Sequence, residues 1–340
     1  MLNAFRSEGV IVDLVTGDSS QRKQCIDTVS ALIESGVKYD FVYSESSTMP
    51  TALTDANHFP SRPFLDFNFF RYCQKSNIPV GLFYRDIYWR FKNYGTDLNF
   101  IKLYFAKLFY WYDILCYSKF VDRIYLPTIS MSKYVPCIKK NKFNSLPPGH
   151  DNYEPQVVSN ANFDTNNPLK LFYVGGLSDH YKMHVLFKVV SRREDIRLVV
   201  CTRKQEWEKV RSEYLEFVND IDIVHEHGDE MLALMAEADI VSTYVLPQDY
   251  WEFAAPVKLY EYIGMSKPIL ASQGTYAGDF VNKHGIGWAV NYDVQELDRF
   301  FDSFKHSPQK IIEAKVKVED IRMEHTWRSR ARQVIEELTQ

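Results

Sequence analysis

The chain has 340 residues, of which 46% are hydrophobic and 25% charged, and its formal net charge is −4. This composition is typical of a globular protein, long enough for two domains that each bury a core. The sequence contains no concentrated basic block, which argues against a nucleic-acid partner, because a phosphate backbone needs a clustered basic face. It also contains no apolar run long enough to span a membrane, and residues 1–20 carry charges where a signal peptide would be apolar.

The first residues predict an incomplete start to an α/β domain. Residues 1–17 fit the end of a helix, a turn at Gly9 and a strand over Val10–Thr16. A dinucleotide-type domain normally opens with its innermost strand and a glycine-bearing loop, so we expect this domain to lack its first strand here. Further strands are predicted at Phe41–Tyr43, Val80–Tyr84 and Arg123–Leu126.

Aromatic residues make up 15% of the chain, and many lie in FIKLYFAKLFYWYDILCYSKF, Phe100–Phe120, which predicts a helix. A helix lying on a membrane surface is one interpretation. At about 100° per residue, however, Lys102, Lys107 and Lys119 point in different directions, whereas a simple interfacial helix would gather them on one face. We therefore expect a mostly buried helix, with peripheral membrane association as the alternative.

The second half predicts a new α/β series. The connection to it includes SLPPGHD (Ser145–Asp151) and NANFDTNNP (Asn160–Pro168), whose composition is typical of a link between domains. Helical segments then separate short apolar runs, as parallel βαβ units require. The predicted strands are Leu169–Gly176, Ile196–Thr202, Ile221–His227, Asp239–Val245, Pro268–Ser272 and Gly287–Val290.

Five scattered cysteines form no CxxC pair, which predicts reduced and mostly buried thiols. We therefore expect a cytoplasmic protein, with the inner face of a membrane as the alternative location. The cysteines are Cys25, Cys73, Cys116, Cys137 and Cys201.

Gly175 and Gly176 end a predicted strand and enter a helix, where backbone N–H groups can approach a phosphate. Lys182 would add a cation, although the same glycines also fit a plain turn between two elements. Arg203 follows the next predicted strand and could reach a diphosphate or face water. His227 is expected beside the same edge of the sheet.

Four of the histidines form two closely spaced pairs, but neither pair predicts a metal site. His225 and His227 would point the same way on a strand, and His180 and His184 are four residues apart. The first pair has no evident third ligand and the second has no HExxH glutamate. We expect no metal.

The stretch PVKLYEYIGMSKPILAS predicts a short helix that begins after Pro256 and leads into a buried strand. Glu261 could accept two hydrogen bonds from a ribose diol, with Lys258 one turn nearer the phosphates. The alternative is a solvent-exposed Lys–Glu pair that contributes about 0.3 kcal/mol. This stretch alone does not decide between the two.

In the first half, Arg85 and Asp86 follow a predicted strand in IPVGLFYRDIYWRF. Asp86 could position or deprotonate a hydroxyl group, and Arg85 could bind a phosphate or an acidic group. A structural ion pair between them is the alternative. The loop Tyr43–Pro50 is a candidate acceptor loop, and its Glu45 is a rival to Asp86.

In order along the chain, YVGGL, TRK, HGDEMLALMAEADIVSTY and PVKLYEYIGMSKPILAS resemble the nucleotide-sugar domain of GT-B glycosyltransferases, particularly family 4. The closing HTWRSRARQVIEEL is similar to that family's C-terminal helix. The resemblance is good over residues 145–340 and loose before them. It implies two Rossmann-like α/β domains facing a cleft: an acceptor domain over 1–150, a nucleotide-sugar domain over 151–325, and a helix over 326–340 that crosses back to the first domain.

The resemblance implies a retaining glycosyltransferase that needs no cofactor beyond its UDP- or GDP-sugar donor. We expect it to need no metal if Lys182, Arg203, Lys258 and helix N-termini neutralise the leaving diphosphate. A glycan or lipid-linked molecule, as in cell-surface polysaccharide or glycolipid synthesis, would be the acceptor. The implied catalytic residues are Asp86 and Arg85. The implied donor-binding residues are Gly175, Gly176, Lys182, Arg203, His227, Phe253, Ala254, Ala255, Lys258 and Glu261.

Two positions depart from the family pattern. Gly176 stands where an arginine often follows the first glycine, and Phe253 stands where an acidic residue is expected, with Glu252 displaced by one. The identity of the sugar therefore stays open. A non-catalytic sugar-nucleotide-binding subunit and a nucleotide-sugar epimerase of the same fold are the alternatives to a transferase.

Overall fold

The structure is a computed structural model that describes residues 1–92, 94–96, 98–151, 167–178, 181–217, 221–305 and 307–340. The chain forms two compact units. Unit 1 comprises residues 1–147 and 330–340, and unit 2 comprises residues 148–329. Most of the predicted connection over Asn160–Pro168 lies outside the described residues.

Unit 1 is built on a parallel sheet whose four strands follow one another in chain order. The strands are β1 (Val42–Glu45), β2 (Val80–Phe83), β3 (Arg123–Leu126) and β4 (Phe143–Ser145). The helices are α1 (Leu2–Ser7), α2 (Ser19–Glu34), α3 (Leu65–Lys75) and α4 (Phe100–Phe120), together with most of α12 (Trp327–Leu338).

The strand predicted over Val10–Thr16 is wrong. These residues form no strand, and Ile11 is 95% exposed. A short apolar run becomes a strand only where another strand accepts its hydrogen bonds. The prediction also missed β4, because three residues are too few to show a periodicity.

The prediction of a mostly buried α4 is only half correct. The helix has the predicted bounds, and one face packs inward through residues such as Tyr110, Ile114 and Tyr117. Its other face leaves large apolar side chains in contact with solvent, among them Ile101 at 62% and Leu115 at 57% exposure. An apolar sequence does not by itself reveal which face finds a partner.

The C-terminal helix α12 packs on the sheet of unit 1. One face of the helix is buried, with Val334 fully covered and Leu338 6% exposed. The side-chain amide of Gln333 donates a hydrogen bond to the carbonyl of Ser145 at 2.9 Å. The end of the chain thus belongs to the same compact unit as its beginning.

Replacing Gly81 with alanine is expected to destabilise unit 1 by about 1–3 kcal/mol. A Cβ at this position in β2 would lie 2.7 Å from Leu338 Cδ1 and 3.1 Å from the ring of Tyr125. Urea unfolding measures the change. The double variant G81A/L338A should lose less free energy of unfolding than the sum of the single variants, since truncating Leu338 removes the clash. Strict additivity would contradict the packing of α12 on β2.

Unit 2 contains a six-stranded parallel sheet in the order β10-β9-β8-β5-β6-β7. All six strands were predicted from the sequence within a few residues. They are β5 (Leu169–Val174), β6 (Ile196–Cys201), β7 (Ile221–Val224), β8 (Ile240–Thr243), β9 (Ile269–Ser272) and β10 (Gly287–Val290). The helices are α5 (His184–Val190), α6 (Lys204–Val210), α7 (Gly228–Glu237), α8 (Val257–Gly264), α9 (Tyr276–His284), α10 (Val294–Lys305) and α11 (Gln309–Arg322).

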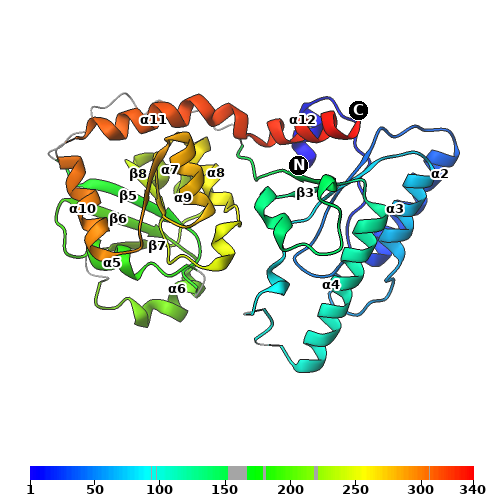
Figure 1. Cartoon of the computed structure of the whole chain (residues 1–340), viewed down its shortest axis with the longest axis horizontal. Helices are drawn as coiled ribbons and strands as arrows, with labels where there is room; N and C mark the ends of the chain where they lie inside the picture. The colour runs from blue at the N-terminus through cyan, green and yellow to red at the C-terminus, as the bar shows by residue number, and fades with distance from the viewer. Residues whose placement is uncertain (93, 97, 152–166, 179–180, 218–220, 306) are drawn as a thin grey trace. The chain divides into compact units, whose positions relative to one another are not determined.

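Both faces of this sheet are covered by helices (Figure 1). Alternate residues of β5 point to opposite faces, as a strand requires. Leu171 and Tyr173 join a core with α5 and α10, whereas Phe172 joins a second core with α8 and α9. Burial on both faces explains why these strands appear in the sequence as nearly continuous apolar runs.

Candidate functional site

The sheet of unit 2 has a topological switch point between β5 and β8. From these neighbouring strands the chain winds outward in opposite directions, to β6 and β7 on one side and to β9 and β10 on the other. Ligands of open parallel sheets bind outside the carboxyl ends of the strands at such a point. Gly175 follows β5 there, and Thr243 ends β8.

Gly175 makes a turn that a larger residue would not allow. Its φ is +139°, and a Cβ at this position would lie 2.5 Å from Lys258 Nζ. The hydroxyl of Tyr173 donates a hydrogen bond to the carbonyl of Gly176 at 2.6 Å, which holds the turn. The bare backbone therefore lets the ammonium group of Lys258 reach the end of β5.

Lys258 lies against two aromatic rings. Its Nζ is 4.0 Å from the ring centroid of Tyr173 and 4.6 Å from that of Tyr181. Burial lowers the pKa of Lys258 to about 7, although the charges of Glu261 and Glu206 act in the opposite direction. A ligand that brings negative charge to this position would raise that pKa again. Lys258 is therefore suited to bind an anion near neutral pH.

Glu261 lies one turn further along α8. Burial raises the pKa of its half-buried carboxyl, Lys258 lowers it and Asp151 raises it. The pair is not the solvent-exposed kind that contributes only about 0.3 kcal/mol. A carboxylate oxygen accepts hydrogen bonds readily, so Glu261 can hold a vicinal diol. Lys258 and Glu261 thus place a cation and an acceptor one turn apart at the switch point.

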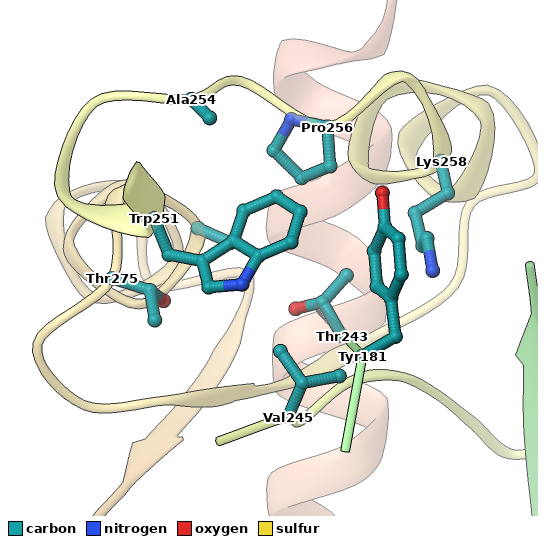
Figure 2. A pocket seen from close by; sticks show the side chains of 9 residues that line it. Tyr181, Thr243, Val245, Trp251, Ala254, Pro256, Lys258 and Thr275 are labelled. Atoms are coloured by element: carbon teal, nitrogen blue, oxygen red, sulfur yellow. The ribbon is translucent and has the colours of Figure 1, made fainter. Parts of the chain in front are cut away.

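A narrow pocket opens beside Lys258 (Figure 2). Its volume is about 20 Å³, roughly the space of one water molecule. Figure 2 shows the indole of Trp251 lying between Thr275 and Tyr181, and the ring centroids of Trp251 and Tyr181 are 5.0 Å apart. A ligand larger than water needs these rings to move. The remaining lining residues are Thr243, Val245, Ala254, Pro256 and Ala277.

Two backbone amides that the resemblance assigns to the donor already have partners in the protein. The N–H of Gly175 donates to the carbonyl of Cys201 at 3.0 Å, and that of Ala254 donates to Tyr250 at 3.1 Å. In this structure these amides hold the turns in place. A phosphate here would therefore meet the side chain of Lys258 rather than either amide.

The stretch before α8 contributes packing as well as pocket lining. The ring of Phe253 is 1% exposed and meets Tyr250 at 5.2 Å, edge to face. Ala255 packs against the core under α8, whereas the side chain of Ala254 lines the pocket. Phe253 therefore fills the core at the position where the family often carries an acid.

Of the ten predicted donor residues, Ala254 and Lys258 line the pocket, and the other eight, including Glu261, do not. The side chain of Arg203 is 86% exposed and forms an ion pair with Glu206. Glu206 in turn lies close to Gly176, where a Cβ would be 2.7 Å from its Oε2. His227 precedes α7 after β7, the outer strand, two places from β5. Lys182 is half-buried.

Neither histidine pair belongs to a group of metal-ligating side chains among the described residues. Among the residues that the structure describes, no three His, Cys, Asp or Glu side chains lie together as metal ligands do. His184 instead stacks on Tyr214 at 4.4 Å and lies 3.4 Å from Glu213. Its predicted partner, His180, lies outside the described residues.

Six residues of the pocket were not predicted from the sequence: Tyr181, Thr243, Val245, Trp251, Thr275 and Ala277. Thr243 ends β8, and Thr275 caps α9 directly after β9, so the rule that ligands meet the carboxyl ends of strands could have found both. Trp251, in the turn over 249–252, meets Tyr181 across a long stretch of sequence. No local pattern signals such a contact.

Unit 1 contains a larger cavity, of about 270 Å³, at the carboxyl ends of β1 and β2. Asp86 lines it, and its Oδ1 accepts a hydrogen bond from the N–H of Tyr88 at 2.8 Å. The remaining lining residues are Thr48, Met49, Tyr88, Trp89, Tyr94 and Tyr110, and most of them are aromatic. One carboxylate among aromatic rings is an arrangement that can hold a polyhydroxylated ring.

The side chain of Arg85 lies at the carboxyl end of β1. Its Nη2 pairs with Glu45 Oε2 at 3.2 Å, and its backbone N–H donates to the hydroxyl of Ser46 at 3.0 Å. Both side chains of the ion pair are more than a third exposed, so the pair contributes little to stability. Of the two predicted catalytic residues, Asp86 is the one that lines the cavity.

Several solved structures have the same fold as this chain. No protein-family model matches the chain, and no curated protein matches its sequence. HepE from Anabaena, in complex with UDP, is 14% identical with a TM-score of 0.64, over 99% of this chain and 88% of that chain. A glycosyltransferase from Rickettsia africae is 12% identical with a TM-score of 0.62, over 99% and 86%. Sucrose-phosphate synthase from Thermosynechococcus elongatus is 12% identical with a TM-score of 0.60, over 94% and 79%.

The chain therefore has the GT-B fold, with two Rossmann-like domains, as its sequence predicts. The six-stranded sheet of unit 2 has the strand order of a dinucleotide-binding fold.

Proposed function

From the GT-B fold and the site at its switch point, we propose that this protein is a glycosyltransferase that uses a nucleotide-diphosphate sugar. One observation carries the proposal: Lys258 reaches the backbone turn at Gly175, with Glu261 one turn behind it on α8. A cation at the carboxyl ends of the switch-point strands suits a diphosphate, and a carboxylate beside it suits a ribose.

The proposed chemistry is displacement at the anomeric carbon of the donor sugar. The oxygen of an acceptor hydroxyl forms a bond to that carbon on the face that the diphosphate leaves, as retention requires. The bond from the carbon to the diphosphate oxygen breaks, and the hydroxyl proton passes to that oxygen or to Asp86. Negative charge grows on the leaving diphosphate, where protonated Lys258 stabilises it. We propose that the reaction needs no metal ion, because Lys258, together with the more distant Lys182 and Arg203, would neutralise this negative charge. Retention of configuration is proposed from the sequence resemblance.

We propose that the acceptor binds in the cavity of unit 1. Aromatic rings offer apolar faces to the C–H face of a sugar, and Asp86 would orient or deprotonate the reacting hydroxyl. UDP or GDP is the proposed carrier, and HepE was solved with UDP bound. A glycan or a lipid-linked glycan is the proposed acceptor.

A thermal-shift screen across UDP-, GDP-, ADP- and CMP-sugars tests the proposal, because a ligand that binds only the folded protein raises its melting temperature. Product analysis with the stabilising donor then separates three outcomes. Transfer of the sugar supports the proposal, a free epimer would identify an epimerase, and binding without turnover would indicate a binding subunit. No stabilisation by any sugar nucleotide would overturn the proposal.

Replacing Glu261 with alanine is expected to weaken binding of the nucleotide sugar at least about tenfold, ~1.4 kcal/mol, because two charge-assisted hydrogen bonds to the ribose are lost. Isothermal titration calorimetry measures the change. Glu313→Ala, at an exposed position of α11, is the matched control and should bind like the wild type. Equal affinities for E261A and the wild type would remove Glu261 from the ribose site.

A further inference from the structure

The exposed face of α4 carries a continuous apolar stripe, formed by Ile101, Tyr104, Phe105, Leu108, Trp111 and Leu115 (the α4 stripe). The exposed fractions of these residues run from 37% for Trp111 to 62% for Ile101. At about 100° per residue they occupy an arc of roughly 120° that runs for about 20 Å along the helix. An apolar face of this extent on a protein surface indicates an interaction site.

Cations flank the α4 stripe. Lys102 lies about 60° beyond one edge and Lys107 about 40° beyond the other, while Lys119 lies near its end, and all three are exposed. The only carboxylate of α4, Asp113, is 4% exposed and accepts a hydrogen bond from the backbone N–H of Thr51 at 2.8 Å. The charges that α4 presents to solvent are therefore all positive.

This arrangement differs from the expectation that an interfacial helix gathers its lysines on one face. Long lysine side chains beside an apolar stripe can extend to the headgroups while the stripe enters the lipid. Tyr104 and Trp111 have the apolar body and polar edge typical of the bilayer interface. Figure 1 shows the N-terminal half of α4 extending beyond the sheet of unit 1.

We propose that the α4 stripe is the surface by which this protein binds an anionic lipid bilayer. α4 would lie in the interface plane, with the apolar side chains in the acyl boundary and the lysines at the headgroups. A second copy fits less well, because symmetric pairing would bring the flanking lysines together. No helix among the described residues is long and apolar enough to cross a membrane.

The stripe adjoins the cavity of unit 1. The rings of Trp111 and Trp89 meet edge to face at 5.7 Å, and Arg90 lies over both, 5.6 and 5.7 Å from their centroids. Trp89 is also a wall of the cavity that Asp86 lines. A bilayer against the stripe would therefore adjoin the cavity, which suits a lipid-linked acceptor. This last step rests on the proposed function, whereas membrane binding does not.

Vesicle sedimentation without any sugar nucleotide tests the proposal. We expect the full chain to bind vesicles of phosphatidylcholine with a quarter phosphatidylglycerol, and to bind pure phosphatidylcholine more weakly. Leu108→Glu should lower the partition coefficient at least about tenfold, because an apolar side chain leaves the lipid and a carboxylate faces anionic headgroups. Val316→Glu, at an exposed apolar position of α11, is the matched control and should bind like the wild type.

The double variant Lys102→Gln/Lys107→Gln gives a second readout that does not depend on apolar substitution. Each lysine is expected to contribute roughly fivefold to binding of anionic vesicles and nothing to binding of neutral ones. Brominated lipid should quench the tryptophan fluorescence of the wild type more than that of Trp111→Phe. Unchanged circular dichroism and melting temperature in each variant establish that the fold is intact.

Absence of wild-type binding to anionic vesicles would overturn the proposal, as would binding that L108E leaves unchanged. A wild-type dimer that L108E splits, without vesicle binding, would identify a second copy as the occupant instead. None of these results bears on donor binding in unit 2, so the proposal and the proposed function can fail separately.

Discussion

Replacement of Asp86 by asparagine is expected to lower the turnover number at least about 100-fold while leaving the affinity for the nucleotide sugar nearly unchanged. Asp86 lines the cavity of unit 1, whereas the donor residues Lys258 and Glu261 belong to unit 2. Asparagine keeps the side-chain oxygen that accepts from the N–H of Tyr88, so the local turn should persist. What it loses is the charge that orients or deprotonates the acceptor hydroxyl.

Release of nucleoside diphosphate at saturating donor measures the turnover of D86N, and calorimetry measures its donor affinity. Glu45→Gln is the matched comparison, since it removes the exposed ion pair with Arg85 and leaves the lining of the cavity intact. Full activity in D86N would exclude Asp86 from catalysis. Loss of activity in E45Q with an active D86N would transfer the role to Glu45.

Replacement of Lys258 by methionine is expected to weaken donor binding about 30-fold or more at neutral pH, ~2 kcal/mol, because a buried charge partner of the diphosphate is removed. Methionine keeps the length and the apolar stem of the side chain, so the contacts with Tyr173 and Tyr181 largely persist. Lys209→Met, at an exposed position of α6, is the matched control. Equal affinities for K258M and the wild type would contradict a phosphate role for Lys258.

The same residue predicts how donor binding depends on pH. Burial lowers the pKa of Lys258 to about 7, and a bound diphosphate favours the protonated form. Above pH 7 the protein must therefore take up a proton to bind, and affinity should fall by up to about tenfold per pH unit. The nucleotide sugar keeps its charge across this range, so K258M should show a flat profile in calorimetry.

A stability measurement provides an independent check on this pKa. The folded pKa of about 7 lies below the ordinary value of 10.5, so the unfolded chain binds more protons between these two values. The free energy of unfolding of the wild type, relative to K258M, should therefore rise with pH across this window. Burial of the charged Lys258 lowers the free energy of unfolding by its full amount only below pH 7, where the side chain is protonated in the folded protein. A constant difference between the two proteins would show that Lys258 has an ordinary pKa.

The sequence predicted the elements of unit 2 well because their signals are local. Strands such as β5 and β9 are short apolar runs bounded by turn residues, and burial on both faces makes them stand out. Lys258 and Glu261 were predicted as donor-binding residues because their spacing on one helix and its place in an ordered set of motifs are readable without coordinates. Their burial, which shifts both pKa values, was not readable in that way.

The sequence failed where a partner distant in the chain decides the outcome. Val10–Thr16 has the apolar run of a buried strand and forms none, whereas Phe143–Ser145 is too short to show a pattern and pairs with β3. The contact between Trp251 and Tyr181 that narrows the pocket joins segments far apart in sequence. Such pairings depend on which surfaces meet after the chain has folded.

By itself the sequence determined the α/β architecture and the order of the motifs, and it predicted Lys258 and Glu261 as the donor-binding pair of α8. Only the tertiary structure decided that Lys258 approaches a bare glycine turn, that Asp86 lines an aromatic cavity, and that α4 leaves an apolar face uncovered. The physical reason is common to all three. Periodicity indicates which residues share a face of an element, but burial, charge state and cavity shape depend on what packs against that face.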